Sequence, residues 1–190
     1  MTTRPADNPV FARKVSPASV PLADPTTLAR LWRAPVDHPH KILVADDESL
    51  SAASVMLCLR QLGFATVGPA HDGVHAIELA FSTLPDMALL DARMSTDADG
   101  IDAARAMFHE LLIPVVIVSA YADRQQVAGA AEAGVFGYLV KPVTKDQLRP
   151  VIEVAWARFN QYMARDIEVE IMRRQLTERQ DITHAPRGHW

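Results

Sequence analysis

The chain has 190 residues and a formal net charge of −4, with 49% hydrophobic and 22% charged residues. This composition excludes a wholly disordered chain, and the net charge gives no general attraction to nucleic acid. The single cysteine, Cys58, excludes a disulfide within one chain, and no stretch is apolar for long enough to cross a membrane. We therefore expect a cytoplasmic protein without a membrane partner, with Cys58 buried as a small apolar side chain.

The N-terminal segment differs in composition from the rest of the chain. Residues 1–39 contain seven of the thirteen prolines, separated by Ser, Thr and Asp. This composition predicts an extended, proline-rich arm. Asp24 and Pro25 have the pattern of a helix start, so a short helix over residues 25–33 is one interpretation. A frayed linker fits the same residues equally well.

From Lys41 onwards, strand and helix patterns alternate. We expect strands at residues 41–45, 64–70, 86–91, 113–120 and 137–142. We expect helices at residues 48–63, 72–82, 100–111 and 123–134, and a last helix after Thr144. Five strands that alternate with five helices predict an α/β fold with a doubly wound, five-stranded parallel sheet.

The last helical pattern is much longer than the others. Residues 151–180 contain neither Gly nor Pro, whereas Pro150 should either kink the helix or lie in its first turn. Two apolar stripes can be drawn: Ile152, Ala155, Phe159, Tyr162, Val169 and Leu176, or Trp156, Phe159, Met163, Ile167 and Ile171. Asp166 and Arg173 interrupt the first stripe, so the coiled-coil register stays open. A long projecting helix needs a partner for its apolar surface, and we expect a homodimer through it.

Polar residues stand at the predicted carboxyl ends of four strands: Asp46, Asp47, Asp91, Ser119 and Lys141. In a doubly wound sheet these ends meet at one edge, where sites form. Three carboxylates suit Mg²⁺, and a carboxylate can also accept a phosphoryl group. An ammonium and a hydroxyl can stabilise the charge of that group. Taken singly, each residue has a simpler explanation, because acids after a strand often cap a helix or face water.

Four sequence blocks carry a resemblance to a known family. They are ILVADDE, MALLDARM, VIVSAYAD and GYLVKPV, with intervals of 44, 28 and 22 residues between Asp47, Asp91, Ser119 and Lys141. Together they resemble the receiver domain of two-component response regulators, over residues 41 to about 157. This resemblance implies a flavodoxin-like receiver fold that carries a long C-terminal helix.

The resemblance also implies a phosphorylation site. Asp91 would accept a phosphoryl group from a sensor histidine kinase. Asp46, Asp47 and Asp91 would bind Mg²⁺ together with the backbone carbonyl of Arg93. The sequence departs from the family in the loop after Asp91, which is longer and has Ser95 where the family has proline.

Three further roles follow from the same resemblance. Ser119 would bind the phosphoryl group, and Lys141 would pair with the phosphorylated acid. Tyr138 would be the aromatic switch that carries the signal to the outer face. His71 and His75 are four residues apart and could share a metal, but no third ligand stands at a matching spacing, so we expect a solvated or capping role.

The C-terminal segment carries a second resemblance. Residues 151–185 resemble the linker helix of regulators with an ANTAR module, which binds RNA to prevent transcription termination. Residues 165–190 hold five Arg and five acidic residues, so we do not expect this chain to bind nucleic acid. We predict three parts: the arm at 1–39, a receiver domain at 40–157, and an extended helix or coiled coil at 158–190 that includes a truncated ANTAR-like start.

These expectations combine into one function and two alternatives. The predicted protein is a signalling receiver and not a turnover enzyme: Mg²⁺-dependent phosphorylation of Asp91 switches dimerisation or partner docking. One alternative is an RNA-binding transcription antiterminator of which this chain is a truncated form. The other is a Mg²⁺-dependent phosphatase of the haloacid-dehalogenase type, but such enzymes carry Asp-x-Asp after the first strand, where this chain has Asp46 and Asp47.

Overall fold

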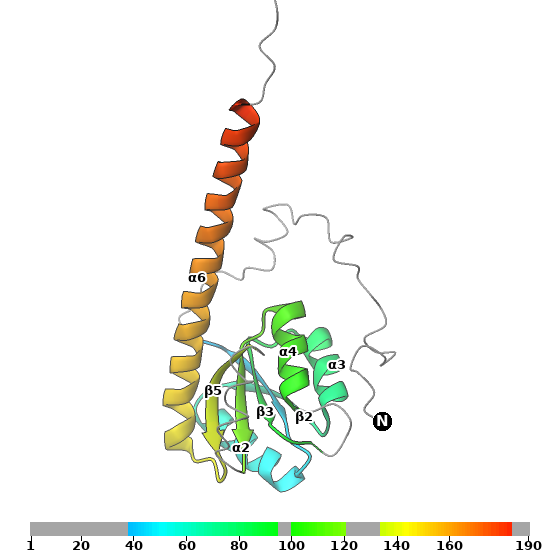
Figure 1. The fold of residues 1–190 in the computed structure, drawn as a ribbon. Coiled ribbons are helices and arrows are strands. Elements are labelled where there is room, and N and C mark those ends of the chain that lie inside the picture. The colour runs from blue at the N-terminus through cyan, green and yellow to red at the C-terminus, as the bar shows by residue number, and fades with distance from the viewer. Residues whose placement is uncertain (1–37, 95–99, 121–133, 184–190) are drawn as a thin grey trace, which may run out of the picture. The chain divides into compact units, whose positions relative to one another are not determined.

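The structure is a computed structural model that describes residues 38–94, 100–120 and 134–183, with side chains in the last helix described at 145–169 and at 172 (Figure 1). Several expectations lie outside these residues. They are the N-terminal arm with its possible short helix, the loop that contains Ser95, and most of the helix expected at 123–134.

One sheet of five parallel strands forms the centre of the described fold (Figure 1). The strands are β1 (Lys41–Ala45), β2 (Ala65–Ala70), β3 (Met87–Asp91), β4 (Val115–Ser119) and β5 (Val135–Val140). Their order is β2-β1-β3-β4-β5, and every neighbouring pair is parallel. In chain order, β2 is therefore added on one side of β1, and β3, β4 and β5 are added in turn on its other side. The carboxyl ends of β1 and β3 mark the point at which the order reverses, where doubly wound folds place their sites.

Four described helices cover the two faces of the sheet. They are α2 (Ser49–Gln61), α3 (Gly73–Thr83), α4 (Gly100–Leu111) and α6 (Lys145–Thr183). Helices α2 and α6 pack together on one face, and α3 and α4 pack together on the other (Figure 1). The predicted doubly wound α/β fold with a long C-terminal helix is confirmed.

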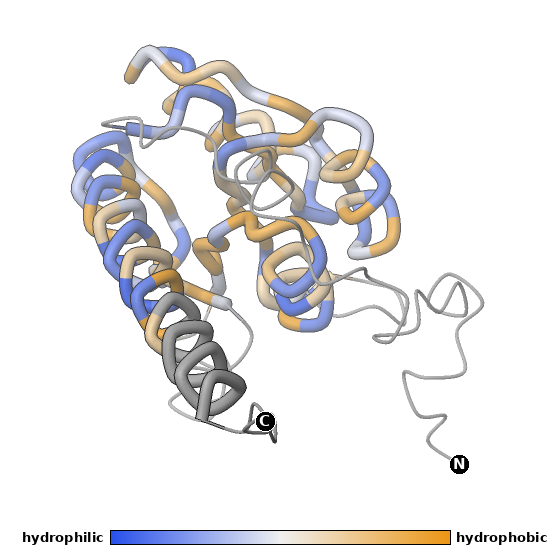
Figure 2. Tube along the Cα trace, turned by 90° about the horizontal axis from the view of Figure 1, so that it is seen from above, coloured by the Kyte–Doolittle hydropathy of each residue, from blue (hydrophilic) through white to orange (hydrophobic). Residues whose placement is uncertain are grey.

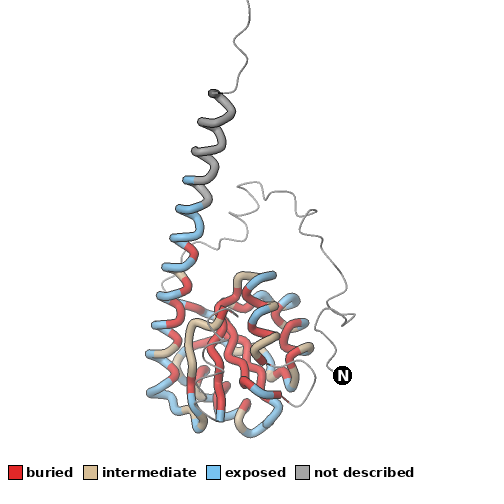
Figure 3. The backbone as a smooth tube through the Cα atoms, viewed as in Figure 1, coloured by how far each residue is buried: buried red, intermediate tan, exposed pale blue. Residues whose placement is uncertain are grey.

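The core is the sheet itself, because helices cover it on both sides. All five residues of β3 and all five of β4 are buried, which explains why these strands are almost continuously apolar in sequence. Figure 2 shows the apolar residues gathered in the centre, and Figure 3 shows the buried backbone in the same region. Among the described residues, three polar or charged side chains are buried: Asp46, Asp91 and Ser119. All three lie at carboxyl ends of strands, so the molecule places its costly buried polar groups at one edge of the sheet.

Helix α6 begins at Lys145, after a cap formed by Thr144. The backbone N–H of Thr144 donates to Oε1 of Gln147 at 3.0 Å, as in a capping box. Pro150 lies inside the helix, five residues beyond its start. Of the two alternatives for Pro150, a position in the first turn is thus excluded. The helix also runs without a break through residue 157, and the domain boundaries proposed from the sequence stay a prediction.

The apolar residues of α6 divide into two groups along the helix. Those that pack on the receiver are Ile152, Ala155, Trp156, Phe159 and Met163, all of them buried (Figure 3). Those that are exposed in the single chain are Val154, Ile167, Val169 and Met172, and Tyr162 is partly exposed although its ring also contacts Phe108 of α4. Much of the apolar surface that suggested a partner is thus buried within the same chain. Among the described side chains of α6, the second group is the apolar surface left for a partner.

Cys58 corrects another expectation. Its side chain in α2 is half-buried and not buried, because the side of α2 that faces the core is made by Ala52, Val55, Met56 and Leu59. Leu50 and Leu57 of the same helix are exposed, so apolar residues occur on both sides of α2. The sequence pattern therefore does not show which side of the helix faces the core.

None of the helices in the described ranges combines the length and hydropathy needed to cross a membrane.

We predict that Ile152→Ala lowers the free energy of unfolding by about 2–5 kcal/mol, because Ile152 is fully buried between α6 and the sheet. Val154→Ala on the same helix is the matched control. Val154 is half exposed, so we expect a change within about 0.5 kcal/mol. Urea denaturation of both variants measures this difference, and equal losses would contradict the packing of α6 on the sheet.

Candidate functional site

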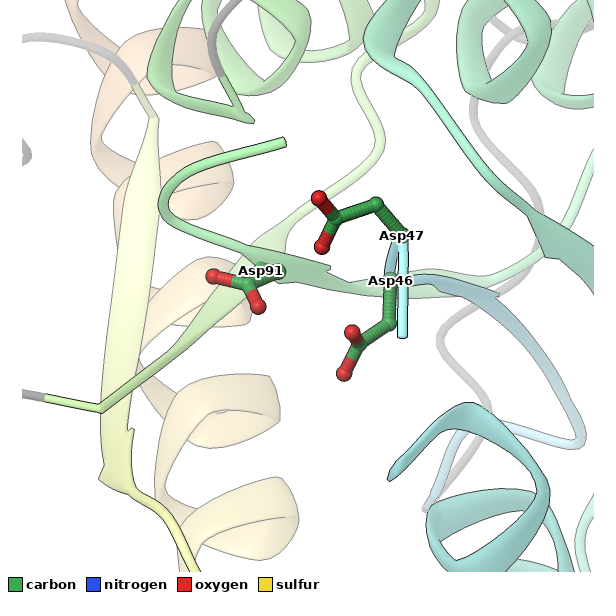
Figure 4. Close-up of side chains that lie close together, drawn as sticks. All are labelled: Asp46, Asp47 and Asp91. Atoms are coloured by element: carbon green, nitrogen blue, oxygen red, sulfur yellow. The ribbon is translucent and has the colours of Figure 1, made fainter. Parts of the chain in front are cut away.

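Three carboxylates meet where the strand order reverses. Asp46 and Asp47 follow β1, and Asp91 is the last residue of β3. One carboxylate oxygen from each lies within 4.8 Å of the others (Figure 4). Asp46 and Asp91 are buried, with 3% and 8% of their surface exposed, whereas Asp47 is exposed. Buried like charges at this separation repel strongly, so the cluster requires a cation.

Lys141 supplies one positive charge. Its Nζ lies 2.8 Å from Oδ2 of Asp46 and 2.5 Å from Oδ2 of Asp91. The backbone N–H of Lys141 donates to the carbonyl of Ser119 at 2.8 Å, and this bond fixes the start of the lysine side chain beside the end of β4. Three carboxylates and one ammonium leave a net charge of −2. A divalent cation would neutralise this charge.

The two buried carboxylates alter the titration of Lys141. Partial burial by itself lowers the pKa of the ammonium, but hydrogen bonds from Nζ to Asp46 and Asp91 and the charges of both acids outweigh it. The pKa of Lys141 is therefore raised above its ordinary value of 10.5. At neutral pH the lysine stays charged and bridges the ends of β1 and β3.

Backbone groups orient both buried carboxylates in the same way. The N–H of Glu48 donates to Oδ1 of Asp46 at 2.9 Å, and the N–H of Arg93 donates to Oδ1 of Asp91 at 3.0 Å. In each case the donor lies two residues after the acid, so the turn that follows the strand holds its own carboxylate. Oδ2 of each acid faces the ammonium of Lys141.

The first turn of α2 contributes a residue that the sequence analysis missed. The Oγ of Ser51 donates to Oδ2 of Asp46 at 2.6 Å. A serine in the first turn of the helix after an acidic strand end is the only sequence signal for this contact. Many such serines face solvent, and for that reason the signal was too weak to use.

The other predicted site residues lie close to the same edge of the sheet. Ser119 is buried at the end of β4, and Tyr138 lies half-buried in β5. Arg93 is exposed, and it is placed by its N–H contact with Asp91. The roles proposed for Ser119 and Tyr138, and for the carbonyl of Arg93 as a metal ligand, stay predictions.

The two histidines do not join the acidic cluster as a metal pair. His71 places Nδ1 3.3 Å from the backbone carbonyl of Asp46, whereas at His75 the backbone N–H is capped by Asp72 at 2.7 Å. Within the described ranges, the group of three or more possible metal ligands consists of the three aspartates alone.

The start of α4 packs directly against the backbone of Asp91. A Cβ on Gly100 would collide with the carbonyl of Asp91, so only glycine permits this approach. The position of Asp91 therefore depends on α4 as well as on β3.

Comparison with known proteins supports the same interpretation. A family model described as the response regulator receiver domain matches residues 42–153, which is 112 of the 190 residues. The chain belongs to this family. Its receiver domain places the acidic cluster at the carboxyl edge of the sheet, and the resemblance drawn from the four sequence blocks is confirmed.

Two curated relatives of the receiver illustrate the extent of the similarity. The chain is 37% identical over 147 residues to the transcriptional regulatory protein PdtaR of Mycobacterium tuberculosis, covering 77% of this chain and 71% of PdtaR. It is 38% identical to the chemotaxis protein CheY of Pseudomonas aeruginosa, covering 63% of this chain and 98% of CheY. The ANTAR-like resemblance of the C-terminal helix is consistent with this similarity to PdtaR.

Solved structures agree with the receiver fold. The signal receiver domain of the putative response regulator NarL from Mycobacterium tuberculosis has a TM-score of 0.57 and 34% identity, and the match covers 62% of this chain and 97% of NarL's. The receiver domain of a modulated diguanylate cyclase from Desulfovibrio desulfuricans has a TM-score of 0.60 and 29% identity, and the match covers 66% of this chain and 98% of that chain.

The raised pKa of Lys141 predicts a pH dependence of stability in the receiver without metal. Because the folded pKa exceeds the ordinary value of 10.5, the stabilisation is fully present below pH 10.5 and is lost as the pH rises through the folded pKa. We expect wild type to be more stable than Lys141→Met at pH 7–9, by a constant margin. That margin should narrow above pH 10.5.

Chemical denaturation in EDTA across this pH range measures the margin. Lys145→Met is the control, because Lys145 is an exposed lysine at the start of α6. A margin that is unchanged up to the highest accessible pH would contradict the ion pairs of Lys141.

Proposed function

We propose that this response regulator accepts a phosphoryl group on Asp91 from a sensor histidine kinase in a Mg²⁺-dependent reaction, and that phosphorylation changes self-association or partner docking through α6. The observation that carries this proposal is the cluster of Asp46, Asp47 and Asp91 with Lys141 at the reversal of strand order. Membership of the receiver family supports a role in two-component signalling. The cytoplasmic location expected from the sequence stays a prediction.

The donor set fits Mg²⁺. All three acids offer hard oxygen ligands, and the net charge of −2 matches a divalent cation. Asp47 is exposed, so the cluster is open to solvent on its side, as expected for an ion that keeps some of its waters. When bound, Mg²⁺ would neutralise negative charge on the carboxylates and on the incoming phosphoryl group. The carbonyl of Arg93 is proposed as a further ligand.

Asp91 is better placed than Asp46 to act as the acceptor. Asp46 accepts three described donors, Glu48 at Oδ1 and both Ser51 and Lys141 at Oδ2. Asp91 accepts two, the N–H of Arg93 at Oδ1 and the ammonium of Lys141 at Oδ2. A carboxylate with fewer donors keeps more lone-pair density for attack on phosphorus.

The transfer itself follows from the charges of these residues. A carboxylate oxygen of Asp91 forms a bond to phosphorus, and the bond from phosphorus to the histidine nitrogen of the kinase breaks. The electron pair of that bond goes to the imidazole. Lys141 and Ser119 are proposed to balance the charge on the phosphoryl oxygens. Asp91 is consumed once per signal, so the receiver modifies itself and does not turn over like the phosphatase alternative.

A cluster of aromatic rings connects β5 to α6. The ring of Phe136 lies 5.4 Å from Phe108 of α4, 5.6 Å from Phe159 and 6.1 Å from Tyr162, measured between ring centroids. Phe136 stands two residues before Tyr138 in β5, at a register shift where β4 pairs with Val135 and then with Gly137. We propose that a shift of Ser119 and Tyr138 after phosphorylation reaches α6 through these rings.

Dimerisation is proposed through the exposed part of α6. Ile167, Val169 and Met172 are between 41% and 53% exposed in the single chain. Apolar groups at this exposure on a long helix favour a second helix over water. The RNA-binding alternative is placed second, because residues 165–190 hold equal numbers of Arg and acidic residues.

Asp91→Asn tests the acceptor. With acetyl phosphate, an acyl phosphate of the same chemical class as the product, and Mg²⁺, we expect wild type to gain one phosphoryl group and the variant none. Intact mass spectrometry measures the gain. EDTA should prevent it, and Asp146→Asn, an exposed acid in the first turn of α6, is the control and should behave as wild type. Phosphorylation of Asp91→Asn at the wild-type level would exclude Asp91 as the acceptor, and release of many phosphates per chain would favour the phosphatase.

Phe136→Leu tests the aromatic connection. Light-scattering chromatography with Mg²⁺ and beryllofluoride, which mimics the aspartyl-phosphate, should show a change in mass or shape of wild type. We expect Phe136→Leu to bind Mg²⁺ within about twofold of wild type but to lose most of this change, because the ring contacts with Phe159 and Tyr162 of α6 are removed. Phe81→Leu, at a half-exposed phenylalanine of α3, is the control. A full response by Phe136→Leu would exclude this route.

A further inference from the structure

Ser51 connects α2 to the acidic cluster by one short hydrogen bond. It is the third residue of α2, and its hydroxyl donates to Oδ2 of Asp46 at 2.6 Å. The acceptor is a buried carboxylate, and hydrogen bonds to charged acceptors are stronger than those between neutral groups. The contact therefore acts on the buried acid at the end of β1.

The hydroxyl completes a set of donors around Asp46. The N–H of Glu48 holds Oδ1, and Ser51 and Lys141 share Oδ2. Glu48 and Ser51 belong to the segment that directly follows Asp46, so together they fix both oxygens from one side. The plane of this carboxylate is thus set by local structure, even without Lys141.

Lys141 cannot replace this local support once a cation enters. Its ammonium bridges Asp46 and Asp91 at the end of a long flexible side chain, and a divalent cation at the cluster competes with it for the same carboxylates. If Lys141 turns towards the phosphoryl group, as the proposed function requires, Oδ2 of Asp46 keeps Ser51 as a donor. The serine is held on a helix and does not need to move.

We propose that Ser51 is a positioning residue of the metal site: its hydroxyl holds Asp46 in the orientation that binds Mg²⁺ and thereby raises the affinity of the receiver for the ion. The inference rests on the proposed function, because it assumes that the cluster binds Mg²⁺. Hydrogen-bond partners of metal ligands commonly contribute 10–100-fold to metal affinity. Ser51 has no contact with the ion in this account and acts only through Asp46.

Isothermal titration calorimetry with MgCl₂ tests this role without any phosphorylation step. We expect Ser51→Ala to weaken Mg²⁺ binding by about tenfold, at the low end of that range, because Asp46 also keeps the N–H of Glu48. Ser51→Thr restores a hydroxyl at the same position and should recover most of the affinity. Ser54→Ala is the matched control, since Ser54 is an exposed serine on the same helix.

Denaturation of the same variants in EDTA separates positioning from a general loss of structure. Alanine is the best helix former, so Ser51→Ala is expected to fold. Equal Mg²⁺ affinities of wild type and Ser51→Ala would overturn the inference and leave the proposed function intact. Weakened binding that Ser51→Thr does not recover would also overturn it, because the hydroxyl would then not be the cause. Absence of Mg²⁺ binding by wild type would overturn the proposed function and this inference with it.

Discussion

The bridge of Lys141 between Asp46 and Asp91 is the interaction on which the site depends. Strands β1 and β3 lie where the strand order reverses, and the bridge joins their carboxyl ends to the end of the edge strand β5. Burying two carboxylates side by side is unfavourable, and one ammonium offsets only part of their charge. The remaining negative charge makes the cluster receptive to a divalent cation. The feature that is costly for folding is therefore the one that gives the site its chemistry.

The sheet and most of the site were predictable from the sequence for a topological reason. Parallel strands that are covered on both faces are continuously apolar, so β3 and β4 stand out in the sequence. Their polar terminal residues, Asp91 and Ser119, then have to lie at one edge of the sheet. No knowledge of side-chain geometry was needed, since strand order and direction alone bring Asp46 and Lys141 to the same edge.

Features that depend on helix orientation were not predictable in this way. Apolar residues on both sides of α2 concealed which one faces the core, and Cys58 was assigned to the wrong environment. The contact of Ser51 with Asp46 depends on the angle at which α2 leaves β1, and the sequence does not encode that angle in any simple pattern. Similarly, the sequence did not decide how α6 accommodates Pro150, which lies beyond the first turn and cannot donate a backbone hydrogen bond to the carbonyl of Asp146.

The continuity of α6 makes it a lever. Met163 is the last buried residue among the described side chains of α6, which pack on the receiver up to that point, and the helix continues to Thr183. At 1.5 Å per residue the free part is about 30 Å long, so a tilt of about 5° at its root moves its end by roughly 2–3 Å. Rearrangements too small to change the receiver surface appreciably are thereby enlarged at the tip. Two such levers side by side would convert a subtle change at each root into a different spacing between their ends.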